Sequence, residues 1–141
     1  MAFNKNRVLV GTNGYLWLNG DLLAQIKKVE VKVTGSFEDI SVCGEYGTYS
    51  VYTGWSGEGT ITLQKIDSTA LKTLGDAYKS GIMPDLKIIS KLTDKETQKS
   101  ERVSISDVVF TEFYLANFEN KGLIEEAIPI KFSDYEILET I

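Results

Sequence analysis

The stretch Gly14-Tyr15-Leu16-Trp17-Leu18-Asn19-Gly20-Asp21-Leu22-Leu23-Ala24 carries the strongest secondary-structure signal in the chain. Two largely apolar runs, residues 15–18 and 21–24, flank the dipeptide Asn19-Gly20. Both residues of that dipeptide accept the positive φ angles of a type I′ turn. The stretch therefore predicts a tight β-hairpin.

The second arm of this hairpin continues as a long strand with a change of phase. Its apolar side chains lie first at even positions and then at odd ones: Leu22, Ala24 and Ile26, followed by Val29, Val31 and Val33. Because strand side chains alternate with period 2, the switch predicts a bulge or a bend near Lys27-Lys28. Strands that bend in this way pass from one packed surface to another in barrels and sandwiches.

Residues 34–47 are predicted to form a long loop, since they contain three glycines and several charges. This segment also carries Phe37, Glu38, Ile40 and Tyr46. A loop with so many apolar side chains is expected to pack against another surface. Two interpretations stay open. The loop folds back on its own core, or it docks on a neighbouring subunit.

The rest of the chain predicts further strands and one helix. Strands are expected at residues 48–53 and 59–66, joined by residues 54–58, and a hairpin at 86–92 and 102–110. Residues 68–80 predict an amphipathic helix, with Asp67 or Ser68 as N-cap and Gly81 ending it. Residues 108–118 read as a strand buried on both faces. In the last strand, Ile128, Ile130 and Phe132 share one face with Glu126 at its start, and Pro129 favours an edge position.

These elements predict one domain, residues 1–141, of mainly β class: a small barrel or sandwich with one flanking helix. The length of 141 residues and the 43% hydrophobic content are sufficient for a core without disulfides. No apolar run reaches about 20 residues, and no secretory signal is recognisable, so we expect synthesis in the cytoplasm and no membrane span.

The sequence offers no recognisable catalytic, cofactor-binding or metal-binding residues. It has no histidine and a single cysteine, Cys43, which excludes the common triads and histidine-containing metal sites. The glycine-rich stretch Gly54-Trp55-Ser56-Gly57-Glu58-Gly59 lacks the Gly-Lys-Ser/Thr ending and the following helix of a phosphate loop. Adjacent Glu125 and Glu126 point to opposite faces of a strand and are expected to be solvated or lumen-facing charges. We expect a protein that is not an enzyme.

The net charge of −5 is concentrated in the last third of the chain. Residues 101–141 hold three Lys/Arg against nine Asp/Glu, a net of −6. A protein that reads DNA sequence would instead cluster lysine and arginine to neutralise phosphates.

Taken in order, several of these motifs resemble the tail-tube proteins of contractile-tailed phages and phage-like particles. They are residues 14–21, the stretch Gly54-Trp55-Ser56-Gly57-Glu58-Gly59 with the strand after it, the helix, and the ending at 125–138. The resemblance is to the Gram-positive type, which includes PBSX-like elements and phage-tail-like bacteriocins, and it covers nearly the whole chain. Two positions depart from it: Thr69 stands where an arginine is favoured, and Ile130 where an aromatic residue is favoured.

The resemblance implies a structural subunit of the inner tail tube. Six copies would form a ring, and rings would stack into a hollow tube inside a contractile sheath, with baseplate and tape-measure proteins as further partners. In a phage the tube conducts DNA without binding it specifically; in a bacteriocin it forms a membrane-piercing channel. Six subunits would carry about −30 charges per ring before screening.

Two surfaces follow as candidates. The subunit-interface loop would use Phe37, Glu38, Ile40 and Tyr46. The face toward the lumen would use Thr60, Thr62, Gln64, Glu125 and Glu126, because it is polar and in part acidic. Two other functions remain open: the tube of a type VI secretion-like machine, and a monomeric β-barrel that binds a small ligand in its interior.

Overall fold

Strands make up most of the chain, with one α-helix, as the sequence predicts for a mainly β protein. A computed structural model describes residues 4–23, 25–66 and 68–141. The elements, in order, are 3₁₀ helices Lys5–Arg7 and Gly11–Asn13, strands β1 Gly14–Leu18, β2 Asp21–Leu22, β3 Ile26–Ser41 and β4 Thr48–Gln64, helix α1 Thr69–Ser80, and strands β5 Leu86–Thr93, β6 Ser100–Phe110, β7 Glu125–Phe132 and β8 Asp134–Glu139.

The predicted hairpin and bulge are both present. Leu18 pairs with Asp21 across a turn in which Asn19 has φ 51° and Gly20 φ 91°. The register of β3 against β4 shifts between Ile26 and Lys28, where the hydrophobic phase changes. Ala24, which was expected to extend the second arm, lies outside the described residues.

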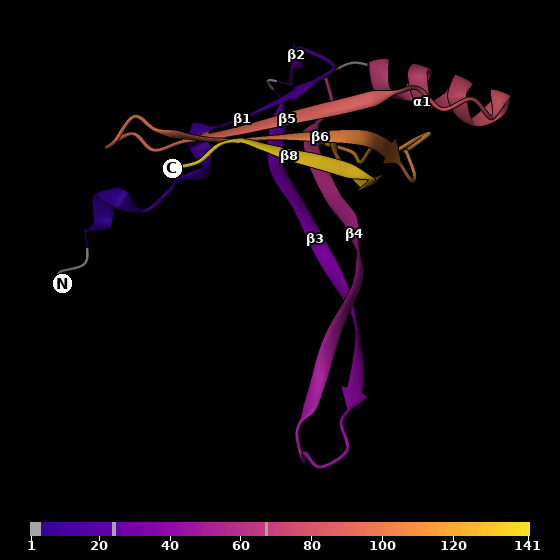
Figure 1. The fold of residues 1–141 in the computed structure, drawn as a ribbon. Helices are drawn as coiled ribbons and strands as arrows, with labels where there is room; N and C mark the ends of the chain where they lie inside the picture. Colours follow the sequence, from indigo (N-terminus) through magenta and orange to yellow (C-terminus); the bar gives the residue numbers. More distant parts are fainter. Residues whose placement is uncertain (1–3, 24, 67) are drawn as a thin grey trace.

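Strand β6 joins two groups of strands by changing partners along its length. Residues Arg102–Ser106 pair with β8, whereas Val109 and Phe110 pair with β7. Asp107 lies between these segments with φ 54°, a backbone kink that turns the strand. Strands β1, β5, β6 and β8 therefore run across strands β3 and β4, as Figure 1 shows, and all strands but β8 form the order β2-β1-β5-β6-β7-β4-β3.

Helix α1 packs its apolar stripe at one end of the sheet. Leu74 and Ala77 are buried, and Leu74 belongs to the same core cluster as Ile61 and Ile128. The helix ends as predicted at Gly81, which has φ 77° and donates its N–H to the Ala77 carbonyl oxygen. At the other end, Ser68 occupies the N-cap position without a side-chain capping bond, and the alternative Asp67 lies outside the described residues.

Residues 34–47 are not the predicted long loop. Strand β3 continues to Ser41, and β4 runs without a break from Thr48 to Gln64 through the expected connection 54–58. The glycines and charges here suggested turns, but each strand pairs along its length with the other, which satisfies the backbone groups that the two strands turn toward each other. Only residues 42–47 connect the strands, and the hairpin extends far from the body of the subunit (Figure 1).

The predicted strand at 108–118 and the predicted edge position of the last strand are also wrong. Strand β6 ends at Phe110, and the apolar residues beyond it do not lie between two sheets. Phe113 packs edge-on against Tyr78 of α1 with ring centroids 5.1 Å apart, while Leu115 and Phe118 are exposed. Strand β7 lies between β4 and β6. Pro129 is tolerated there because the β6 ladder has already ended, and its carbonyl accepts from the Thr111 N–H.

Candidate assembly surfaces

The outer part of the β3–β4 hairpin, residues 34–55, is here called the distal hairpin. It is a two-stranded ribbon whose large apolar side chains are mostly exposed: Phe37, Ile40, Val42, Tyr46, Tyr49, Val51 and Tyr52. Phe37 and Tyr52 lie edge-on on one face with ring centroids 5.6 Å apart, and Ile40 and Tyr49 pair on the other face. A two-stranded ribbon is marginally stable alone in water, and this one leaves apolar groups on both faces uncovered within the described subunit.

Of the four residues predicted for the subunit interface, three lie on strand β3 and one in the turn. Phe37, Glu38 and Ile40 are exposed along the strand, and Tyr46 is fully exposed in the turn. The turn is supported from within, since the Tyr49 hydroxyl donates to the Glu45 carboxylate and the Ser50 hydroxyl donates to Asp39 at 2.7 Å. The bond to Glu45 raises the pKa of Tyr49, because it stabilises the protonated phenol.

The glycine-rich stretch has a packing role in β4. Gly54 lies beside a register shift and has φ 153°, a backbone conformation that favours glycine. Gly57 lies under the ring of Phe132, its cross-strand partner, and a β-carbon there would approach ring atom Cδ2 to 2.6 Å. At Gly59 a β-carbon would lie 3.0 Å from the Val31 Cα and closer still to the Glu30 carbonyl oxygen. Trp55 lies beside this cluster, half-buried against Phe132 and Tyr135.

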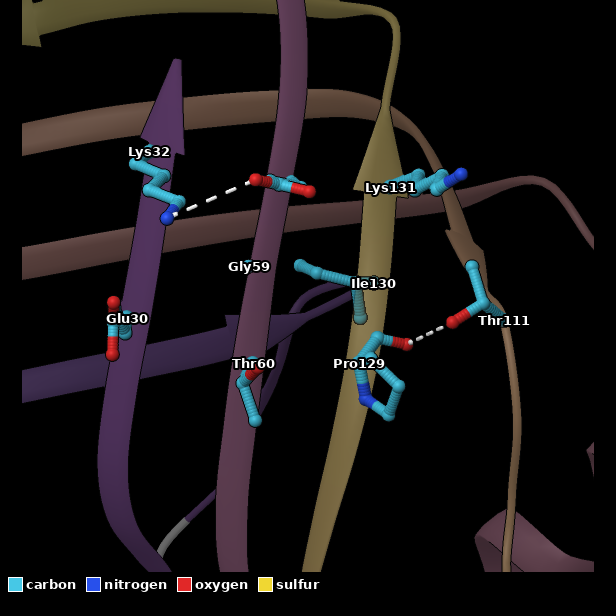
Figure 2. A pocket seen from close by; sticks show the side chains of 9 residues that line it. Glu30, Lys32, Gly59, Thr60, Thr111, Pro129, Ile130 and Lys131 are labelled. Carbon is cyan, nitrogen blue, oxygen red and sulfur yellow. Dashed lines mark hydrogen bonds and ion pairs between the residues drawn. The ribbon is translucent and has the colours of Figure 1, made fainter. Parts of the chain in front are cut away.

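The outward face of strands β3, β4 and β7 is polar, and it is here called the polar face. Thr60 lies directly opposite Glu30 on one side and Pro129 on the other, as Figure 2 shows. Lys32 forms an ion pair with Glu58 at 3.8 Å, and Lys131 lies across from Glu58 on the other neighbouring strand. Thr62 and Gln64 extend the same face along β4, and the Gln64 side-chain amide donates to Glu125 at 3.3 Å.

Glu125 and Glu126 point to opposite faces, as their adjacency predicts, but only one is solvated. Glu125 is exposed on the polar face, and the Lys27 ammonium lies 2.5 Å from its Oε1. The hydrogen bond from Lys27 lowers the pKa of Glu125. Glu126 is only 6% exposed, so the expectation that it is a solvated charge is wrong. It continues the core face of Ile128 and Ile130, with the Lys65 ammonium 3.2 Å from its Oε1.

The polar face does not carry the acidic excess of the last third of the chain. It holds four lysines (Lys27, Lys28, Lys32, Lys131) against three glutamates (Glu30, Glu58, Glu125), a net of +1. Asp134, Glu136 and Glu139 are exposed on β8, in the other group of strands. The polar and the acidic parts of the predicted lumen surface are therefore separate.

Sequence reasoning missed one feature, a groove between α1 and the sheet. It has a volume of about 450 Å³ and is mostly apolar, with lining from β2, α1, β4 and the start of β7. Its residues come from six separate stretches of the chain (18–25, 61–66, 71–74, 86, 110 and 126–128), so no local pattern could have revealed it. Among residues 4–23, 25–66 and 68–141, no cluster of three potential metal ligands is present. None of the helices in that part of the chain is both long and apolar enough to cross a bilayer.

The chain is similar to known proteins along its whole length. A family model described as phage tail tube protein matches residues 1–139. The "Phage-like element PBSX protein XkdM" of Bacillus subtilis (strain 168) is 29% identical over 143 residues, which cover 100% of this chain and 97% of the relative. A second protein of that strain, described as "Uncharacterized protein YqbM", matches at the same identity and coverage.

Solved structures share the fold at much lower identity. The tube-terminating cap of the anti-feeding prophage superposes with a TM-score of 0.74 at 9% identity, covering 99% of this chain and 95% of that one. The SPP1 tail tube superposes with a TM-score of 0.66 at 15% identity, covering 95% of this chain and 81% of the other. The match of the family model to nearly the whole sequence, with an architecture found in tail tubes and their caps, shows that the chain belongs to the phage tail tube protein family.

Proposed function

We propose that six copies of this chain form a ring, and that rings stack into a hollow tube inside a contractile sheath. The observation that supports this most directly is the uncovered distal hairpin. Seven large apolar side chains are exposed together on this hairpin. A soluble monomer rarely leaves so large an apolar patch without a partner. A neighbouring copy supplies the missing cover in the proposed ring.

The free edge of β3 supports the same proposal. Strand β3 is the last strand of the described sheet and pairs only with β4, so one side of its 16 residues offers unpaired backbone groups. Such an edge accepts another strand or requires protection from one. The hairpin and this edge differ from the rest of the surface, so they would bind a different patch on the next copy. Contacts between two different patches are the head-to-tail kind that can close into a ring.

For the lumen, the proposal assigns the polar face of β3, β4 and β7, with Thr60, Thr62, Gln64 and Glu125. Its ion pairs leave few cations free to neutralise phosphates, so DNA would pass with little adhesion. Glu126 is withdrawn from this set because it is buried. In a phage the tube would conduct DNA; in a bacteriocin it would be a membrane-piercing channel, with sheath, baseplate and tape-measure proteins as partners in either particle.

Assembly is tested with the purified chain at increasing concentration, by light scattering and negative-stain microscopy. The wild-type chain is expected to form rings or rods. Ile40→Lys, on the exposed hairpin, is expected to stay monomeric with an unchanged melting temperature, whereas the apolar control Ile40→Val still assembles. A wild-type chain that stays monomeric at all concentrations contradicts the proposal.

The lumen assignment is tested on assembled tubes with a labelled oligonucleotide at low salt. Glu58→Lys adds two positive charges to the polar face and is expected to retain the oligonucleotide with a salt-dependent affinity. The matched variant Glu136→Lys, on β8, makes the same charge change elsewhere. Equal retention by both variants would place the lumen on another face.

The groove beside α1 favours a second candidate, a monomeric module that binds a small apolar ligand. That function requires a size independent of concentration, so the scattering experiment distinguishes the two. A type VI secretion-like tube would assemble in the same manner. Neighbouring genes for sheath, baseplate and capsid distinguish phage, bacteriocin and secretion machine.

A further inference from the structure

The groove between α1 and the sheet ends on a buried carboxylate with an unused hydrogen-bonding position. Its apolar walls include Leu23, Leu71 and Ile128, and Glu126 also lines it. Oε1 of Glu126 makes no hydrogen bond to any described atom. The Lys65 ammonium lies 3.2 Å from that oxygen and compensates its charge, without the geometry of a hydrogen bond.

Because this oxygen is ion-paired but accepts no hydrogen bond, it keeps an acceptor position open, which makes the groove selective for a donor. A buried oxygen that gains a hydrogen bond is more stable than one that lacks it, and the gain is larger when the acceptor is charged. A side chain with an apolar ring or chain and one hydrogen-bond donor at its end would bury apolar surface in the groove and donate to Oε1 of Glu126 at the same time. A tyrosine side chain has both properties.

Tyr46, in the turn of the distal hairpin, has the matching chemistry. It is fully exposed, so its ring is not engaged within its own subunit. The two other tyrosines of the distal hairpin are engaged in their own subunit: Tyr49 donates to Glu45, and Tyr52 packs against Phe37. Tyr114, in the 111–124 loop, is much less exposed than Tyr46. The most exposed apolar residues of the 111–124 loop, Leu115, Phe118 and Leu123, carry no donor.

The hairpin turn and the groove lie at opposite ends of the subunit. In Figure 1 the turn is at the bottom, whereas β2 and α1, which line the groove, are at the top. The turn cannot reach the groove of its own chain, but it can reach the groove of another copy. When one end of a subunit binds the opposite end of the next, each added copy still has a free end that can bind another. Such head-to-tail contacts extend a stack instead of stopping at a dimer.

We propose that the groove beside α1 receives the hairpin turn of a second copy, with Tyr46 seated between α1 and the sheet and its hydroxyl donating to Glu126. This docking depends on the proposed tail-tube function and specifies how one ring holds the next. It gives the groove a protein occupant of this same chain and gives the buried carboxylate a hydrogen-bond donor in addition to its ion pair with Lys65.

Cross-linking tests the docking, because Cys43 is the only cysteine of the chain and lies exposed three residues from Tyr46. Thr73→Cys adds a thiol at the groove, on an exposed position of α1. Assembled tubes treated with a short bis-maleimide are expected to give a ladder of linked subunits. The control Glu136→Cys, on β8, is expected to give none.

The outcomes separate the two proposals. Tubes that form but give no ladder with Thr73→Cys overturn the docking and leave the tail-tube function intact. A chain that forms no tubes at all contradicts the tail-tube function itself. A ladder with Glu136→Cys as strong as with Thr73→Cys also overturns the docking, since the contact would not be specific.

The hydrogen bond is tested with Tyr46→Phe, which removes only the hydroxyl from an exposed side chain and leaves the subunit fold unaffected. A hydrogen bond to a charged group contributes about 1.5–3 kcal/mol, so the critical concentration for assembly is expected to rise about tenfold or more. In a Glu126→Gln background, which removes the charge of the acceptor, the same change is expected to have a much smaller effect. An unchanged critical concentration for Tyr46→Phe would overturn the proposed bond.

Discussion

Gly57→Ala probes the packing of the glycine-rich strand, where the ring of Phe132 takes the place of a side chain. The added methyl would lie 2.6 Å from Cδ2 of that ring, whereas carbon atoms in contact are normally about 3.5–4.0 Å apart. Phe132 is buried, so the ring cannot swing into solvent and must shift about 1 Å against its neighbours. Overpacking of this kind costs about 1–3 kcal/mol.

The net effect is smaller than the clash alone. Replacing glycine with alanine removes freedom from the unfolded chain, which stabilises a protein by about 0.4–1 kcal/mol where the site accepts the methyl. We therefore expect Gly57→Ala to lower the free energy of unfolding by about 1–2 kcal/mol. With an unfolding entropy near 2.1 cal/mol/K per residue, 1 kcal/mol corresponds to about 3 °C for a chain of this length. The expected fall in melting temperature is about 3–6 °C.

Circular dichroism melts at a concentration where the chain is monomeric measure this change. The matched control is Gly47→Ala, where an added methyl meets no atom within 4 Å and the melting temperature should stay unchanged or rise slightly. In a Phe132→Leu background the penalty at Gly57 should shrink, because the ring that causes it is gone. Equal effects of Gly57→Ala in both backgrounds would refute the packing explanation.

Three further changes test the core, a turn and a surface ion pair. Ile88→Ala removes a side chain with 0% exposure and is expected to cost about 2–5 kcal/mol in urea unfolding; a loss under 1 kcal/mol would mean that the core around it is loose. Asp94→Ala removes the acceptor that holds the β5–β6 turn through two hydrogen bonds and is expected to cost about 1–3 kcal/mol, while the exposed control Asp85→Ala is near neutral; similar losses for both would contradict the turn assignment. Lys27→Met should raise the pKa of Glu125, followed by carboxyl NMR. In the wild-type chain, the lowered pKa of Glu125 stabilises the folded state above the unfolded-state pKa, and this stability is lost as the pH falls through the folded-state pKa. The variant lacks this contribution and should lose less stability on acidification than the wild-type chain. An unmoved pKa of Glu125 would show that Lys27 does not cause the shift.

Local patterns in the sequence were sufficient for the elements that depend on neighbouring residues. Asn19-Gly20 sets the first turn, the phase change near Lys27 predicts the bulge, and Gly81 ends the helix. The resemblance to tail-tube proteins could also be recognised from ordered motifs alone. Each of these signals resides in a few consecutive residues, whose φ preferences or alternation are fixed before any packing occurs.

The distal hairpin and the position of Glu126 could not be read from the chain in the same way. Glycines and charges in residues 34–47 have the composition of a loop, and only pairing of residues 34–41 with 48–56 turns that part into strand. Glu126 has the composition of a surface residue, but its place in the β7 register puts it on the core face beside Lys65.

The sequence by itself therefore determined the mainly β class, the turns, the helix and the family. Only the tertiary structure decided which apolar residues remain without cover and which charges face the groove or the solvent. The physical reason is that burial and pairing depend on contacts between residues distant in the chain, such as Lys27 with Glu125 and Gly57 with Phe132, and no local propensity encodes those contacts.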